Sequence, residues 1–239
     1  MSQIVRVQGN AKNFIQGNSQ LIVTLAQTPK NGNLLVAAIG NENPGAPFVV
    51  SSVIQLGVTW TPVVAQIDAA NDADVEIWVG VINQAGASTT VTINITGTPS
   101  DLLIADICEY FLGAPATSFI FLDQNASNGA DGSSAQTDTG TTLPTNQPNE
   151  LLVGAIFAGN FQDASQINPT NGFTMLDGIV NNSGNSLAYL EKIVNQNGAA
   201  NSGTTIGNAG NVWCGCIITI KAAPRSASTY GDGLTSYIC

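Results

Sequence analysis

The chain has 239 residues, of which 44% are hydrophobic and only 9% are charged, with a formal net charge of −10 and no histidine. Soluble domains carry about 25% charged residues, so the polar surface must consist mainly of Asn, Gln, Ser, Thr and Gly side chains. The six basic residues are scattered along the chain, which excludes the clustered cations that nucleic-acid binding requires.

The missing imidazole excludes Ser-His-Asp and Cys-His catalysis and most zinc and copper sites. No Gly-rich phosphate-binding motif occurs either. The start of the chain, Met1 to Val7, shows no basic segment followed by an apolar one, so we expect no Sec-type signal peptide. No apolar run reaches the roughly 18 residues of a transmembrane helix, so we expect no membrane insertion.

Apolar and β-branched patterns predict strands throughout the first half, with turns at Gly9-Asn10 and Gly17-Asn18. The expected strands are Gln3–Gln8, Gln20–Ala26, Leu34–Ile39, Val49–Leu56, Thr59–Val64, Val75–Ile82, Thr89–Thr96 and Asp101–Phe111. Leu34–Ile39 is continuously apolar, which is typical of a strand buried on both faces. Around Gln84 to Ala87 we predict a hairpin that joins Val75–Ile82 to Thr89–Thr96.

The second half repeats this pattern. Its expected strands are Phe119–Gln124, Leu151–Ala158, Phe173–Val180, Leu187–Val194 and Val212–Lys221, and Asn125–Thr142 is either a mobile loop or a flat edge strand. The stretch from Asn149 to Phe157 repeats that from Gly32 to Gly40, and two such matches at a similar offset indicate a duplicated unit. We therefore predict an all-β, jelly-roll-type β-sandwich over 1–223, built from two related halves at about 19–111 and 119–222.

A frame of short motifs carries a resemblance to known proteins. It consists of Asn-x-Leu-Leu-Val (Asn149 to Val153), then Val-Thr or Phe-Thr, then Glu-x-x-Val-Asn-Gln-x-Gly-Ala (Glu191 to Ala199), and then a closing strand. This frame resembles a group of uncharacterised microbial all-β proteins that also occur as modules in extracellular and phage-associated proteins. The resemblance covers nearly Ser2 to Ala223 and implies no catalytic residue. The composition is also similar in style to that of self-assembling extracellular filament subunits.

Carboxylate pairs are the remaining candidates for catalysis, since glycosidases use two Asp or Glu residues. The candidates are Asp74 with Glu76, and Asp106 with Glu109. Few glutamates and tryptophans are available to line a sugar-cleaving cleft, so we predict that the chain is not an enzyme and needs no cofactor. Asp68, Asp72 and Asp74 could supply oxygen ligands to Ca²⁺, although their spacing matches no defined calcium loop.

The four cysteines are the disulfide candidates: Cys108, Cys214, Cys216 and Cys239. Cys214 and Cys216 share a strand face with Val212, Ile218 and Ile220, so we expect this face to point inward. They are either buried thiols that act as small hydrophobic residues, or one of them bonds to Cys108 or Cys239. Cys239 is the best candidate for a bond between subunits. The spacing does not predict a zinc site.

Three sequons begin at Asn94, Asn125 and Asn181, and only Asn125 and Asn181 are expected in loops. About this number is expected by chance in a chain so rich in Asn, Ser and Thr, so the sequence does not predict glycosylation. Trp60 and Trp78 are the evident aromatic candidates for a carbohydrate-binding surface.

After Pro224 the strand pattern ends, and 224–239 forms a polar segment that is either a flexible end or an arm that docks on a neighbouring subunit. We predict a structural subunit whose partners are copies of itself, assembled through sheet packing and this arm. Its expected location is extracellular or at the cell surface, reached without a visible signal peptide. The alternatives are a structural or decoration module of a phage or virion, and a carbohydrate-binding module.

Overall fold

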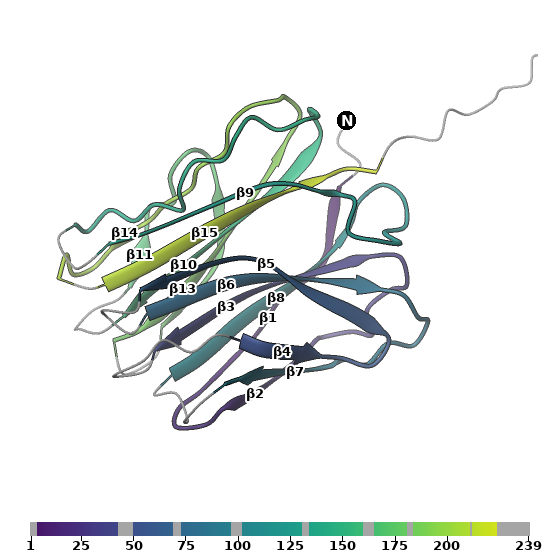
Figure 1. The fold of residues 1–239 in the computed structure, drawn as a ribbon, viewed down its shortest axis with the longest axis horizontal. Coiled ribbons are helices and arrows are strands. Elements are labelled where there is room, and N and C mark those ends of the chain that lie inside the picture. The colour runs from purple at the N-terminus through teal and green to yellow at the C-terminus, as the bar shows by residue number, and fades with distance from the viewer. Residues whose placement is uncertain are drawn as a thin grey trace, which may run out of the picture.

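The computed structural model describes residues 4–42, 50–68, 73–96, 102–130, 134–159, 165–180, 184–210 and 212–223. All regular elements among them are β-strands, which confirms the all-β prediction, and the strands are stacked in layers (Figure 1). No helix in these ranges is long and apolar enough to cross a membrane.

The first sheet has five antiparallel strands in the order β1-β8-β3-β6-β5. Its strands are β1 (Val5–Ile15), β8 (Leu102–Phe111), β3 (Leu34–Glu42), β6 (Ala73–Ile82) and β5 (Val58–Asp68). A small sheet of three strands, β2 (Gln20–Thr24), β7 (Thr90–Ile95) and β4 (Val50–Ile54), packs on its outer face.

The second sheet also has five antiparallel strands, in the order β12-β13-β10-β15-β9. Its strands are β12 (Thr174–Val180), β13 (Ser186–Val194), β10 (Glu150–Gly159), β15 (Val212–Lys221) and β9 (Leu122–Ala130). A short pair, β11 (Gln166–Ile167) and β14 (Thr205–Ile206), forms a separate two-stranded sheet that packs on it through Ile206. In both large sheets, the strand that comes first in its half of the chain neighbours the strand that comes last.

The main core lies between the two large sheets, and it explains the continuous apolar runs. Leu34 and Val36 of β3 point into this core together with Leu151 and Val153 of β10. The alternate residues of β3, such as Leu35, pack instead against the small sheet. A strand covered on both faces needs apolar residues at every position, so the prediction for the stretch around Leu34–Ile39 is confirmed.

An irregular layer covers the outer face of the second sheet. Four threonines of one extended segment, which we call the threonine ladder, bond through their backbone N–H groups to carbonyls of a second segment. These threonines are Thr137, Thr139, Thr142 and Thr145, and their acceptors are Thr204, Ser202, Ala200 and Gly198. The ladder lies so close to the sheet that a Cβ at Gly154 would be 2.2 Å from Ser202 Oγ. Glycine is therefore required at this position of β10.

Two predicted local features are wrong. Gly9-Asn10 does not end the first strand, because register shifts in β1 between Arg6 and Ala11 absorb both residues. β6 and β7 do not form a hairpin: β6 pairs with β3 and β5, whereas β7 pairs with β2 and β4. β6 is buried on both faces and β7 on one, so the two strands belong to different layers.

The strand expected at Phe119–Gln124 begins later, at Leu122, and continues to Ala130. This result confirms the edge-strand alternative for the start of the segment Asn125–Thr142, because β9 pairs only with β15 in the second sheet. Asn125 therefore lies in a strand and not in the loop that we predicted.

Candidate functional site

An apolar pocket of about 270 Å³ lies where the chain leaves the second sheet, and we call it the exit pocket. The connection between the two halves, from Leu112 to Phe121, lines it together with Ala222 and Ala223, which follow β15. Ile120 in its lining is 83% exposed, whereas Phe121 beside it is 8% exposed. An exposed apolar side chain beside an apolar hollow is typical of a protein-binding surface.

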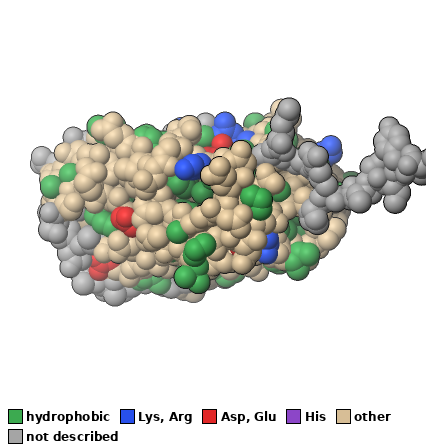
Figure 2. All heavy atoms as spheres, turned by 90° about the horizontal axis from the view of Figure 1, so that it is seen from above, with side chains coloured by type: hydrophobic (Ala, Val, Ile, Leu, Met, Phe, Trp, Pro, Cys, Tyr) green, Lys and Arg blue, Asp and Glu red, His purple; other side chains and the backbone are tan. Residues whose placement is uncertain are grey.

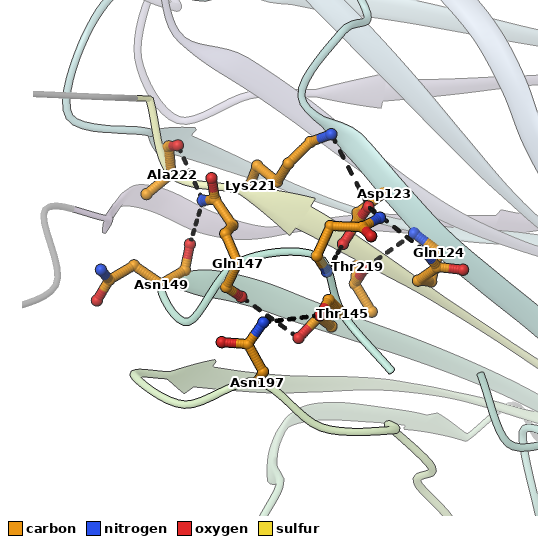
Figure 3. A network of polar contacts seen from close by, with 10 residues as sticks. Asp123, Gln124, Thr145, Gln147, Asn149, Asn197, Thr219, Lys221 and Ala222 are labelled. Atoms are coloured by element: carbon orange, nitrogen blue, oxygen red, sulfur yellow. Dashed lines mark hydrogen bonds and ion pairs between the residues drawn. The ribbon is translucent and has the colours of Figure 1, made fainter. Parts of the chain in front are cut away.

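A network of polar contacts fixes the backbone around this exit (Figure 3). The Gln147 side-chain amide donates to the carbonyl oxygens of Asn149, at 2.8 Å, and Ala222, at 3.1 Å. The Asn197 side-chain amide donates to the carbonyl oxygen of Thr145 at 2.9 Å. These bonds tie the end of the threonine ladder to the last residues of the sandwich, so the exit pocket has a rigid wall.

Asp123 of β9 anchors the same network. Its carboxylate accepts hydrogen bonds from the backbone N–H of Asn146, at 2.6 Å, and from the Asn146 side-chain amide. Lys221 Nζ lies 3.8 Å from Asp123 Oδ1. Burial alone would raise the pKa of Asp123, but the two hydrogen bonds from Asn146, helped by the charge of Lys221, outweigh it and lower the pKa.

Glu150, the first residue of β10, lies beside Asp123 and is fully buried. Neither of its carboxyl oxygens has a partner of good hydrogen-bond geometry within the described chain. Burial, and next the neighbouring Asp123, raise the pKa of Glu150 to about 7. One carboxyl group of the pair is therefore ionised and the other holds its proton in acid and up to neutral pH.

Asp123 and Glu150 have the shifted pKa values of an acid–base pair, but Glu150 is not accessible to a substrate. A general acid must contact its substrate, and Glu150 is 0% exposed beneath the turn that carries Asn146 and Gln147. The pair therefore acts on the structure of the exit and does not face a substrate.

The predicted pair Asp74 and Glu76 does come together on one face of β6. Glu76 Oε2 accepts a bond of 2.6 Å from Trp78 Nε1, and Oε1 accepts one of 2.8 Å from the backbone N–H of Val50. Burial raises the pKa of both carboxyl groups, and in Asp74 the charge of Glu76 adds to it. A hollow of about 400 Å³ borders Glu76. Both carboxylate oxygens of Glu76 already accept hydrogen bonds, one from Val50 in the small sheet and one from Trp78.

The predicted pair Asp106 and Glu109 does not face one site. Asp106 lies on the same face of β8 as Ile104 and Cys108, which belong to the core between the large sheets. Glu109 lies on the same face of β8 as Ile107, which packs against the small sheet. The two side chains therefore lie on opposite faces of β8 and cannot act on one bond.

The three calcium candidates are also separated where they are described. Asp68 pairs with Ala73 and Ile67 pairs with Asp74 across β5 and β6, so Asp68 and Asp74 lie on opposite faces of the sheet. Asp72 lies outside the described residues. Within the described chain no three His, Cys, Asp or Glu side chains gather as a metal site, and Ca²⁺ binding stays a prediction.

Cys108, Cys214 and Cys216 are buried thiols that form no disulfide within the described chain. Cys214 and Cys216 point into the main core as predicted, and their thiols contact the carbonyl oxygens of Ala73 and Val75. Burial raises the pKa of Cys216 well above the usual value of a thiol, which keeps the group protonated and unreactive. Cys239 lies outside the described residues, and a bond from it to a neighbouring subunit stays a prediction.

The two tryptophan candidates do not form an open aromatic surface. Trp78 is 7% exposed, and the ring of Trp60 lies over Gly80, where a Cβ would approach it to 2.9 Å. Among the sequons, Asn94 bonds to Gln20 and Ser52 in the small sheet, whereas Asn181 lies outside the described residues.

Asp123 and Glu150 were not among the predicted site residues. One signal in the sequence points to Glu150: it occupies, in the repeated apolar stretch, the position that Asn33 holds in the first copy. Two polar residues at the same strand position, each followed by a buried strand, indicate a polar cluster at that point. Nothing in the sequence connects Asp123 to it.

The chain was compared with models of known families, with curated proteins and with solved structures, and none of the three comparisons finds a match.

Proposed function

We propose that this chain is a non-enzymatic structural subunit that assembles with copies of itself into an extracellular or cell-surface filament. The exit pocket with the exposed Ile120 carries this proposal. Its occupant is the segment 224–239 of a neighbouring copy, which lies outside the described residues and contains the apolar residues Tyr230, Leu234, Tyr237 and Ile238.

The weakly charged surface supports assembly. Five of the 16 acidic residues of the chain are at most 2% exposed: Asp74, Glu76, Asp106, Glu109 and Glu150. The surface is therefore even poorer in charge than the composition indicates, and Figure 2 shows one face on which uncharged polar side chains and backbone predominate. Neutral side chains lose less hydration energy than ions when a partner covers them.

The position of the occupant favours contact between different copies. Ala222 and Ala223 form part of the pocket wall, and the next residue is Pro224, which biases the residue before it towards an extended backbone. We propose that the segment 224–239, which begins beside the pocket of its own copy, binds the pocket of a neighbouring copy. When a segment of one copy binds a different surface of the next, the contact repeats without closing and gives a polymer.

We also propose that the two halves derive from one duplicated jelly-roll unit. In support, both large sheets have the first strand of their half at an edge and the last strand of that half beside it. The two orders are β1-β8-β3-β6-β5 and β9-β15-β10-β13-β12. Opposite the first of these sheets the order is β2-β7-β4, which fits an eight-stranded jelly roll when β5 is counted as the strand that joins the two layers.

The test compares the full chain with a variant that lacks 224–239, by light scattering after size exclusion and by negative-stain microscopy. We expect filaments from the full chain and monomers from the truncated chain. Ile120→Ser should weaken assembly, whereas Leu143→Ser, which changes a leucine that is 71% exposed elsewhere, should not. A full chain that stays monomeric under all conditions contradicts the proposal.

The inter-subunit disulfide is tested separately. If Cys239 links neighbouring copies, non-reducing electrophoresis of assembled material shows covalent oligomers that disappear in Cys239→Ser. Assembly that persists without these oligomers would mean that the arm binds without a covalent bond.

A further inference from the structure

A groove of about 670 Å³ opens on the second half, between the turn before β12 and the segment that follows β13. Its size lies within the range of small-molecule sites. Its walls carry five side-chain amides, those of Asn171, Asn195, Gln196, Asn197 and Asn201, and Leu152 and Phe173 contribute apolar surface.

Three of these amides are held in fixed positions, and one of them, Asn197 Nδ2, donates to the carbonyl oxygen of Thr145 at 2.9 Å. Asn171 Nδ2 donates to the backbone oxygen and the Oδ1 of Asn201, both at 3.1 Å. Asn201 Nδ2 in turn donates to Asp138 Oδ2 at 2.7 Å. Within the described chain, no hydrogen bond holds the side chains of Asn195 or Gln196, so their donors and acceptors are available on the other wall.

The charge of the groove favours a neutral ligand. Among the described residues that line the groove there is no carboxylate, and the one cation, Lys192, already donates to the carbonyl oxygen of Asn171 at 2.8 Å. The same ammonium group lies 5.7 Å from the centre of the Phe173 ring, where a cation–π contact also stabilises it. An anionic ligand would have to compete with both contacts.

The corresponding place in the first half is closed. There the turn before β5 packs directly on the segment after β6: the N–H of Asn83 donates to the carbonyl oxygen of Gly57 at 3.1 Å, and that of Ser88 to the carbonyl oxygen of Leu56 at 2.9 Å. In the second half the turn at Asn171-Gly172 bonds to the later part of the segment after β13, at Asn201, and the groove opens beside the earlier part of that segment, from Asn195 to Ala199. The open groove is therefore a particular feature of one half.

We propose that this groove binds a neutral oligosaccharide. Each amide both donates and accepts hydrogen bonds, which matches sugar hydroxyl groups that do the same. Ile193 in the lining is 39% exposed, and this apolar surface suits the C–H groups of a sugar ring. The site lies apart from the exit pocket and does not depend on assembly, so the protein would bind glycans as a monomer too.

The test screens the full chain against an array of neutral and acidic glycans, followed by titration calorimetry with chitotetraose, cellotetraose and mannotetraose. We expect binding to a neutral glycan that does not weaken with salt. Asn195→Ala combined with Gln196→Ala should reduce affinity at least tenfold, because both side chains are exposed and removing them leaves the fold intact.

Gln84→Ala is the matched control, because Gln84 is an exposed amide in the corresponding segment of the first half. It should leave affinity unchanged. Three results would each overturn the proposal: no neutral glycan binds, only sulfated or uronic-acid glycans bind, or the double variant binds as well as the parent chain. Since the screen works with monomers, failure of assembly would not affect its outcome.

Discussion

Each half has a polar cluster at the equivalent end of its large sheet. The two clusters differ in how their buried acid groups are stabilised. In the first half Glu109 accepts three hydrogen bonds, from Gln8 Nε2 at 2.5 Å, Asn33 Nδ2 at 2.6 Å and the backbone N–H of Lys30 at 2.9 Å. One buried carboxylate with three donors needs no further compensation.

In the second half the acid groups stand where the first half has amides. Glu150 occupies the position of Asn33, and Asp123 lies on the edge strand β9 as Gln8 lies on the edge strand β1. The position of Glu109 is held by Thr219, whose hydroxyl accepts the backbone N–H of Gln124 at 3.0 Å. Exchanging amides for acids places two carboxyl groups side by side, and burial together with the neighbouring Asp123 makes Glu150 retain its proton up to neutral pH. The first cluster thus surrounds its one buried carboxylate with three donors, whereas the second holds two neighbouring carboxyl groups.

The largest effect is expected from removing the centre of the first cluster. Glu109→Ala leaves three buried donors without an acceptor and creates a cavity, which should lower the free energy of unfolding by about 3–5 kcal/mol. Urea denaturation at constant pH measures the loss. Glu109→Gln keeps the size and one acceptor and should cost less than half as much. A loss below about 1 kcal/mol in Glu109→Ala would show that water replaces the carboxylate.

The next effect concerns pH and the second cluster. Since the pKa of Glu150 is raised to about 7 in the folded chain, the folded state binds more protons than the unfolded state between about pH 4.5 and 7. Stability from this group is fully present below the unfolded value and is lost as pH rises through 7. Asp74 and Glu76 shift in the same direction, so the chain should be more stable in mild acid than above neutral pH.

Glu150→Gln isolates the contribution of the second cluster. The variant cannot ionise, so the fall in the free energy of unfolding from about pH 4.5 to 8 should shrink by about 2–3 kcal/mol. Thermal denaturation across this pH range gives the measurement. If the parent and the variant lose stability in parallel, Glu150 is not the group that titrates.

Much of this fold could be predicted from the sequence, because long, continuously apolar stretches indicate strands that are buried on both faces. Leu34–Ile39 and Leu151–Ala158 are apolar at every position, and only strands covered on both faces require that. The outer layers were harder to predict. The threonine ladder has no apolar alternation, and β7 looks like a hairpin partner of β6 until the small sheet is known. Pairing between distant strands is not encoded in local periodicity.

The polar clusters could not be predicted for the same reason. Asp123 and Glu150 lie on β9 and β10, which are separated in the sheet by β15, so the register of three strands decides whether they meet. The predicted pair Asp74 and Glu76 was found because residues two apart on one strand always share a face. The pair Asp106 and Glu109 fails that rule, since three residues apart places them on opposite faces.

The smallest effect is expected from the cation of the second cluster. Lys221 is partly exposed and its Nζ lies 3.8 Å from Asp123 Oδ1, while Asn146 already donates two hydrogen bonds to that carboxylate. Lys221→Met should therefore cost at most about 1 kcal/mol, measured by urea denaturation at low and high salt. The first cluster supports this small value. There the backbone N–H of Lys30, and not its ammonium group, donates to the Glu109 carboxylate, so N–H donors suffice to stabilise a buried carboxylate. A loss above about 2 kcal/mol that vanishes in high salt would mean that the ion pair, and not Asn146, keeps Asp123 ionised beside Glu150.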